Sequence, residues 1–188
     1  MALPLRAGDI SFDPRITQTD FHTFSLLVAQ GIYADPVQPA RASGIAGFDL
    51  GVAATVVQVD RNATYWLRSV SSDFSTSGYV GVPRIVVSKG FSAGTLSLSY
   101  ARLSNTGIST VGGALDLPII NGGLARPTLA IRAAYSSLNG VSVYRLRTYG
   151  GELFLSKGFG LVVPYIAAGP TRIDARGTIV KTLTNPEI

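Results

Sequence analysis

The sequence predicts an all-β protein: an antiparallel, up-and-down transmembrane β-barrel with about eight visible strands and a short N-terminal helix. Charged residues make up only 14% of the 188 residues, against about 25% in ordinary globular domains. Hydrophobic residues make up 46%, and the mean hydropathy is +0.31. A helical membrane protein needs about 20 consecutive apolar residues per span, and the sequence has no such run. An apolar composition without long apolar runs is typical of a membrane β-barrel.

Residues 1–43 form the first of two expected regions, an N-terminal segment with a short helix and a linker. Thr19 and Asp20 are expected to cap the helix, and Gly31 is expected to stop it. Between them, four apolar residues recur at helical spacing: Phe21, Phe24, Leu27 and Val28. Residues 35–39, which include two prolines, are expected to form the linker. We favour a helix that packs against the end of the barrel over a plug with a transport role.

Residues 44–188 form the second region, the barrel domain, where apolar residues recur with period two. On the first strand Phe48, Leu50, Val52, Ala54 and Val56 share one face, and Asp49, Gly51, Ala53 and Thr55 share the other. Alternation of this length indicates a strand, and its regular recurrence indicates a sheet of hairpins. Strands are expected over 44–58, 79–89, 92–103, 108–119, 127–137, 144–156, 160–172 and 177–184.

The expected turns differ between the two ends of the sheet. The sequence Ser-Lys-Gly-Phe occurs at 88–91 and again at 156–159, and Asn121-Gly122 lies between them. These glycines are expected to supply the positive φ of tight turns, all at one end. The longer connection from Asp60 to Gly78 falls at the other end. Short periplasmic turns opposite longer external loops are the outer-membrane arrangement.

The residues opposite each apolar face decide which face is inside. They are mainly Gly, Ala, Ser and Thr, which suit a narrow lumen better than a solvated exterior, so the apolar faces are expected to meet lipid. The alternative is a soluble lipocalin-like barrel that binds an apolar small ligand. The lumen would receive five charged residues: Asp49, Arg84, Asp116, Arg132 and Glu152. We favour a structural polar network over a charge-lined conduit, because eight strands enclose little more than side-chain volume.

Three arginines, Arg102, Arg145 and Arg147, are expected on the lipid side at the end of the longer connection. Tyrosines one step further in would form an interfacial girdle. Because guanidinium groups bind phosphate bidentately, these arginines are candidates for contact with the anionic glycolipid of an outer leaflet. Nucleic-acid binding also fits the net charge of +5, but the basic residues are not interleaved with stacking aromatics on a polar surface.

The sequence offers little for catalysis or cofactors. A barrel lipid hydrolase, the third and weakest hypothesis, would need His22, the single histidine, as its base. There is no cysteine, no His or Cys cluster for zinc and no phosphate-binding Gly-Lys-Ser/Thr loop. We therefore expect a non-enzymatic protein without metal or cofactor.

The chain resembles a family of uncharacterised proteobacterial outer-membrane β-barrel proteins over residues 20–174. The shared motifs are Asp20-Phe21, residues 44–52 (GIAGFDLGV), Val82-Pro83-Arg84, Ser88-Lys89-Gly90, Gly112-Gly113 with Leu115, and residues 156–159 with Pro164-Tyr165. The resemblance implies a porin-like barrel in the outer membrane of a Gram-negative bacterium. Its partners would be outer-membrane lipid, lipopolysaccharide and the barrel assembly machinery. Members of that family carry further strands and a terminal aromatic, so this barrel is expected to be truncated on its C-terminal side. A structural role or a narrow passive pore is the expected function.

Overall fold

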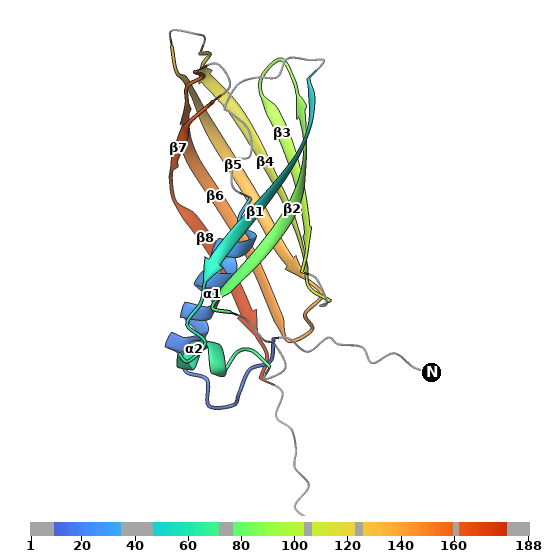
Figure 1. Cartoon of the computed structure of the whole chain (residues 1–188), viewed down its shortest axis with the longest axis vertical. Helices are drawn as coiled ribbons and strands as arrows, with labels where there is room; N and C mark the ends of the chain where they lie inside the picture. Colours follow the sequence, from blue (N-terminus) through green and yellow to red (C-terminus); the bar gives the residue numbers. More distant parts are fainter. Residues whose placement is uncertain are drawn as a thin grey trace, which may run out of the picture.

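A curled antiparallel sheet wraps around an N-terminal helix in the computed structural model, which confirms the predicted all-β, up-and-down fold (Figure 1). The structure describes residues 10–34, 47–71, 77–103, 107–122, 126–159 and 162–179, so the expected linker at 35–39 lies outside the described residues. The elements are α1 (Gln18–Ile32), β1 (Phe48–Gln58), α2 (Thr64–Leu67), β2 (Tyr79–Gly90), β3 (Thr95–Arg102), β4 (Ser109–Ile120), β5 (Thr128–Asn139), β6 (Tyr144–Ser156), β7 (Tyr165–Ala168) and β8 (Thr171–Gly177).

Strands β1 to β6 pair in sequence order, and β7 and β8 both pair with β6. These last two are the halves of one interrupted strand, so the predicted strands at 160–172 and 177–184 had wrong boundaries. The interruption falls at Gly169-Pro170, because proline cannot donate a backbone hydrogen bond to the sheet. The Pro170 carbonyl instead accepts the Gly151 N–H at 3.1 Å. Residues 180–184 of the last predicted strand lie outside the described residues.

The sheet has two edges, and in the part of the chain that the structure describes they do not pair with each other. One edge is β1, and the other is β7 with β8. Strands β1 and β8 both run toward the end where α1 lies, as Figure 1 shows. A strand that closed this gap with antiparallel pairing on both sides would therefore run away from α1. Closure by antiparallel pairing alone would take one such strand, or a larger odd number.

Helix α1 begins two residues earlier than the sequence suggested. Its N-cap is Thr17, not Thr19, and Asp20 is the third helical residue. The Thr17 hydroxyl accepts from the Asp20 N–H at 3.1 Å, and the Asp20 carboxylate accepts from the Thr17 N–H at 3.3 Å. This reciprocal pair is a capping box. Gly31 lies inside the helix rather than after it.

The two ends of the sheet are named here by their contents. The helix end holds α1, α2 and the connections 59–78, 103–108 and 140–143, and the far end holds the connections 91–94, 121–127 and 157–164. The three predicted turns lie at the far end and the longer connection 59–78 lies at the helix end, as the sequence predicted, but the remaining connections at the two ends are of similar length. The positive-φ glycines among the described residues are Gly78 and Gly140, both at the helix end and not at the predicted turns.

The apolar core lies inside the sheet at the helix end. Helix α1 contacts β1, β2, β5, β6 and β8 from within. The buried members of this core are Ile10, Phe12, Phe24, Ala29, Ile32, Ile108, Leu138, Tyr144 and Leu146. Phe24 and Leu146 are almost fully buried, and the rings of Phe24 and Tyr144 lie 5.7 Å apart. The helix therefore fills the interior of this end, instead of packing across its rim.

Candidate functional site

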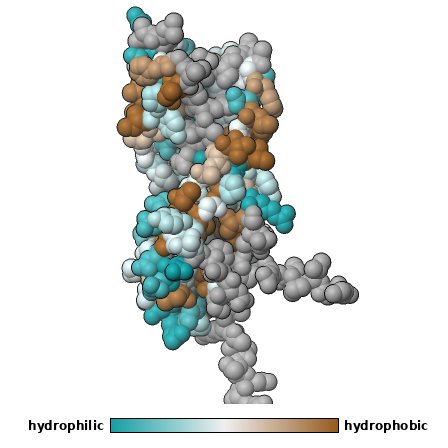
Figure 2. Space-filling model, viewed as in Figure 1, coloured by the Kyte–Doolittle hydropathy of each residue, from teal (hydrophilic) through white to brown (hydrophobic). Residues whose placement is uncertain are grey.

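The outer surface of the far half carries a band of exposed apolar side chains, here called the apolar belt. Its members are Leu50, Val52, Ile85, Leu98, Leu115, Leu117, Ile131, Leu153, Leu155 and Ile166, each 39% to 77% exposed. Figure 2 shows hydrophobic residues gathered over the upper part of the molecule, and hydrophilic residues around the helices at the bottom. Exposed apolar surface of this extent is unusual for a soluble monomer and marks a contact surface.

The inner surface of the same half is polar. Buried inward-facing residues there include Arg84, Ser88, Thr95, Asp116, Thr128, Arg132 and Ser156. The hydroxyl oxygens of Ser88 and Ser97 lie 2.8 Å apart across neighbouring strands. In this half, the usual arrangement of a soluble protein is reversed: apolar residues face out, and polar residues face in, apart from a small buried cluster of Ala130 and Phe154.

Four of the five predicted lumen charges converge around the end of α1. Arg132 Nη1 donates to both carboxylate oxygens of Asp116, at 2.7 and 2.8 Å. Its Nη2 donates to the Ala34 carbonyl at 2.8 Å, and its Nε lies 4.0 Å from Glu152 Oε2. Arg84 donates to the Tyr33 carbonyl. Two arginines of the sheet thus hold the carbonyls that follow the helix, where the helix dipole favours positive charge.

Tyr33 makes the second contact between the helix segment and the polar interior. Its hydroxyl donates to Glu152 Oε1 at 2.7 Å. A Cβ at Gly150 would lie 1.8 Å from this hydroxyl, so the phenol occupies space that only glycine leaves open at that position. No sequence pattern indicated that residues 33–34 are the partners of the lumen charges, because both follow the helix and neither matches a binding motif.

Asp49 does not join this network. It lies near the far end on β1, opposite Ser88, and its side chain is exposed. The structure gives it no hydrogen bond or ion pair to another described residue. Asp49 is on the inward face of its strand, as the alternation predicts, but it lies on the edge strand, far along the sheet from α1, and the structure does not bring it together with the other four charges.

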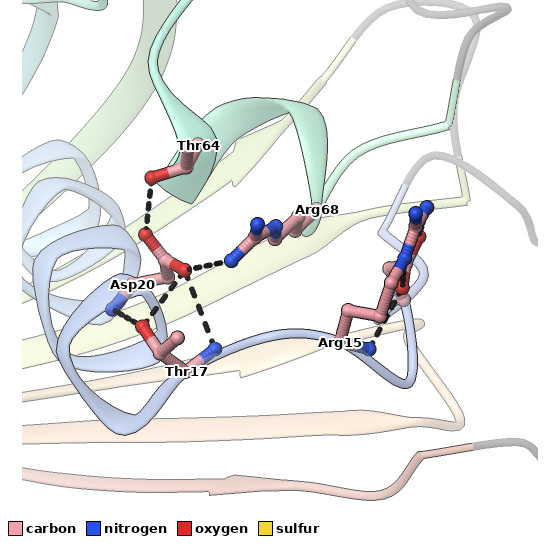
Figure 3. A network of polar contacts seen from close by, with 6 residues as sticks. Arg15, Thr17, Asp20, Thr64 and Arg68 are labelled. Atoms are coloured by element: carbon pink, nitrogen blue, oxygen red, sulfur yellow. Dashed lines mark hydrogen bonds and ion pairs between the residues drawn. The ribbon is translucent and has the colours of Figure 1, made fainter.

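The other end of α1 is tied to the connection that contains α2 (Figure 3). Asp20 accepts from the Thr64 hydroxyl at 2.5 Å and from Arg68 Nη1 at 3.0 Å, in addition to its bonds with Thr17. These donors, first the Thr64 and Thr17 hydroxyls and then Arg68, lower the pKa of Asp20 to about 2. Helix α1 is therefore fixed at both ends by charged groups, with apolar packing between them.

An apolar cavity of about 100 Å³ remains between α1 and the strands at the helix end. Phe24, Leu27, Val28, Gly31 and Ile32 line it from the helix. From the sheet and loops it is lined by Ile10, Val57, Val59, Trp66, Val70, Val80, Val82, Leu103, Ile108, Thr110 and Leu138. Its lining is apolar apart from one threonine hydroxyl, so it suits a small hydrocarbon group rather than a polar solute.

The three predicted lipid-contact arginines face outward, but they do not form one group. Arg145 and Arg147 lie near the start of β6, beside Arg172 and Arg176 of β8. Arg102 lies on β3, separated from β6 by β4 and β5. Three strand spacings correspond to about 14 Å. The pairing of β8 with β6 brings two further arginines beside Arg145 and Arg147.

His22 is exposed on α1, and no hydrogen bond links it to another described residue. Within the described ranges, no group of three or more His, Cys, Asp or Glu residues could hold a metal ion. None of the helices that the structure describes has the length and hydropathy needed to cross a membrane. Comparison with protein-family models, curated proteins and solved structures returns no match.

Proposed function

We propose that this chain is a non-enzymatic β-barrel protein of the outer membrane of a Gram-negative bacterium. The observation that supports the proposal most is the reversal of polarity in the far half of the sheet. A bilayer would cover the apolar belt, whereas exposure to water would leave many large apolar side chains uncovered.

The dimensions of the belt suit a bilayer. On β1 the outward apolar residues run from Phe48 to Val56, about 26 Å along the strand at about 3.3 Å per residue. Strands tilted by about 40° would present about 20 Å of this along the barrel axis, close to the ~25 Å apolar band of outer-membrane barrels. Three exposed tyrosines, Tyr100, Tyr135 and Tyr149, lie on the side of the belt toward the helix end, where an interfacial girdle is expected.

Helix α1 bears on the choice between a structural role and a narrow passive pore. It fills the helix end, and its C-terminal carbonyls are bound by Arg84 and Arg132. A solute would have to displace this helix and separate it from two buried arginines. We therefore favour a structural or plugged barrel over a permanently open pore, with outer-membrane lipid and lipopolysaccharide as its surroundings and the barrel assembly machinery as its insertion partner.

Two arginine substitutions at outward-facing strand residues test the proposal. Ile131 of β5 lies in the apolar belt, and Gln58 lies outside it at the helix end of β1, opposite Tyr79. Ile131→Arg should lower the stability of the protein folded into phosphatidylcholine vesicles by about 2–4 kcal/mol, because the charge must enter hydrocarbon. Gln58→Arg should fold almost as the parent does. Flotation with vesicles and β-sheet circular dichroism would measure both. Equal folding of the two variants, or a parent that does not float, would contradict the proposal.

A second candidate is the binding of an apolar small ligand, and the cavity beside α1 supports it. Apolar cavities of similar size stay dry and take up small hydrocarbons such as benzene. Benzene should then raise the melting temperature of the parent, and Gly31→Leu, which would fill part of the cavity, should abolish the increase. A detergent-free, monodisperse monomer would favour a soluble barrel of this kind over the membrane proposal.

A further inference from the structure

Four arginines gather on the outward face where β6 and β8 pair, near the helix end. Arg145 lies directly opposite Arg176, and Tyr149 lies directly opposite Arg172. Arg147 lies between them on β6, opposite Asp174. Directly opposite residues of an antiparallel pair have Cβ atoms about 5 Å apart, and successive residues on one face are about 7 Å apart. The four guanidinium groups can therefore reach a common point above the sheet.

The charges of this arginine group are poorly balanced. Like charges directly opposite each other destabilise a sheet, and Arg145 and Arg176 are such a pair. Asp174 is the one carboxylate of this face on β6 and β8, and it lies 3.5 Å from Arg176 Nε. The Nε of Arg147 is buried and has no hydrogen-bond partner among the described residues. An anion bound here would offset the repulsion and satisfy that donor.

The position of the group indicates where such an anion would come from. Tyr135 and Tyr149 lie beside it on the far side, with ring centroids 5.2 Å apart, and the apolar belt begins beyond them. Aromatic rings at the border of an apolar band mark the headgroup level of a bilayer. The arginines therefore lie at the depth of lipid phosphates, a few ångströms outside the hydrocarbon.

We propose that Arg145, Arg147, Arg172 and Arg176 form a binding site for the phosphate group of an anionic lipid. This inference rests on the proposed membrane location and extends it to a defined site. Guanidinium groups suit this ligand because they present paired N–H donors to phosphate oxygens without losing their charge. The site is local: Arg102 faces outward at the same end, but three strands away, and has no second arginine opposite it.

The test compares lipid binding by the parent, by the double variant Arg145→Gln/Arg176→Gln, and by Arg102→Gln as the matched control. Each protein is reconstituted in vesicles of phosphatidylcholine with a minor fraction of phosphatidylglycerol and then transferred to detergent. Native mass spectrometry counts the lipids that stay bound. The parent should retain phosphatidylglycerol selectively. The double variant should lose most of this selectivity, about fivefold per removed charge, while Arg102→Gln should keep it.

The outcomes separate the site from the membrane proposal. If all three proteins float with phosphatidylcholine vesicles but retain phosphatidylglycerol equally, the site is wrong and the membrane proposal stands. If the parent does not float, both are wrong. A further arm adds inorganic phosphate at millimolar concentration. Displacement of phosphatidylglycerol by phosphate alone would overturn the assignment to a lipid and indicate a site for the free ion, whereas persistence of the bound lipid supports it.

Discussion

The two halves of strand β6 present opposite faces to their surroundings. At the helix end Leu146 is buried against α1, and Arg145 points outward. In the far half Glu152 points into the sheet, and Leu153 points outward with 57% of its surface exposed. The strand is continuous across this change, so the backbone gives no hint of it. What changes is the material on each side: an apolar helix inside at one end, and in our proposal lipid outside at the other.

The reversal is clearest on β3, β5 and β6 and is absent from β1 and β2. These two strands keep apolar residues on their outer face to the helix end, including Val56 and Tyr79. Their inner face is also apolar there, with Val57 and Val82 buried. Both strands lie at the open edge, where α1 contacts them. The comparison teaches that period-two alternation fixes the two faces of a strand but not which one meets solvent.

The largest effect should come from the polar interior of the far half. Arg132→Leu leaves Asp116 without its partner in a buried position, because the Arg132 side chain is only 3% exposed and that of Asp116 only 12%. The stability should fall by about 3–5 kcal/mol. Denaturant titration in the folding lipid or detergent measures this loss. Replacing both residues by leucine should recover most of it, and a single variant as stable as the parent would show that the pair is dispensable.

A pair of alanine substitutions on β6 should separate the two halves. Leu146→Ala should cost about 2–5 kcal/mol, since Leu146 is fully buried in the core beside α1. Leu153→Ala should cost about 1 kcal/mol or less, since its side chain faces outward and leaves no internal cavity. Thermal unfolding followed by circular dichroism gives both values. Similar losses would mean that the outward face of the far half is packed as tightly as the core beside α1.

Acid should weaken the anchoring of α1 at its N-terminal end. The pKa of Asp20 is about 2 in the folded protein, below its ordinary value of 3.8. The bonds that hold α1 therefore contribute fully above about pH 4, and their contribution is lost as the pH falls toward 2. Hydrogen exchange of the α1 amides, corrected for its intrinsic pH dependence, should show the loss. The Asp20→Asn variant should show a flat response, and an unchanged pH dependence in it would exclude Asp20 as the cause.

The smallest effect concerns Gly31, which lines the cavity in the helix end. A Cβ at this position would lie 3.5 Å from Val57 Cγ2 and 3.7 Å from Val82 Cγ2, both ordinary contacts. Gly31→Ala should therefore stabilise the protein by about 0.5 kcal/mol, because alanine loses less conformational freedom in a helix. The midpoint of chemical denaturation measures the gain. Gly150→Ala serves as the contrast, because the added methyl group should displace the Tyr33 side chain and destabilise the protein.

The sequence predicted those features that depend on local pattern. Six strands, their facing and the existence of α1 follow from alternation and helical spacing, and the positions of Leu98, Ile131 and Arg132 agree with the expected faces. The turns were predicted less well. Gly90, Gly122 and Gly158 were expected to supply the positive φ of tight turns, but the described glycines with positive φ are Gly78 and Gly140. The break at Gly169-Pro170 was missed because the apolar residues at 161–167 continue the strand pattern up to it.

The candidate site was predictable only in part, because it depends on distant contacts. The alternation of residues along the strands was enough to place four charges inside the sheet: Arg84, Asp116, Arg132 and Glu152. It carried no information on Tyr33 and Ala34, which reach these charges from more than 40 residues away in the sequence. The arginine group of β6 and β8 depends likewise on a strand pairing that no local pattern reveals. Neither could be found without the register of the sheet.

The single tryptophan makes the two halves separately visible to spectroscopy. Trp66 lies on α2, and its ring centroid is 6.4 Å from that of Phe24. Its emission therefore reports the docking of α1 at the helix end, whereas the far half has no tryptophan and contributes only to the far-ultraviolet signal of the sheet. For a two-state protein the two signals change together during unfolding. A separation of the two curves would record the helix end opening while the far half stays folded, without any added label.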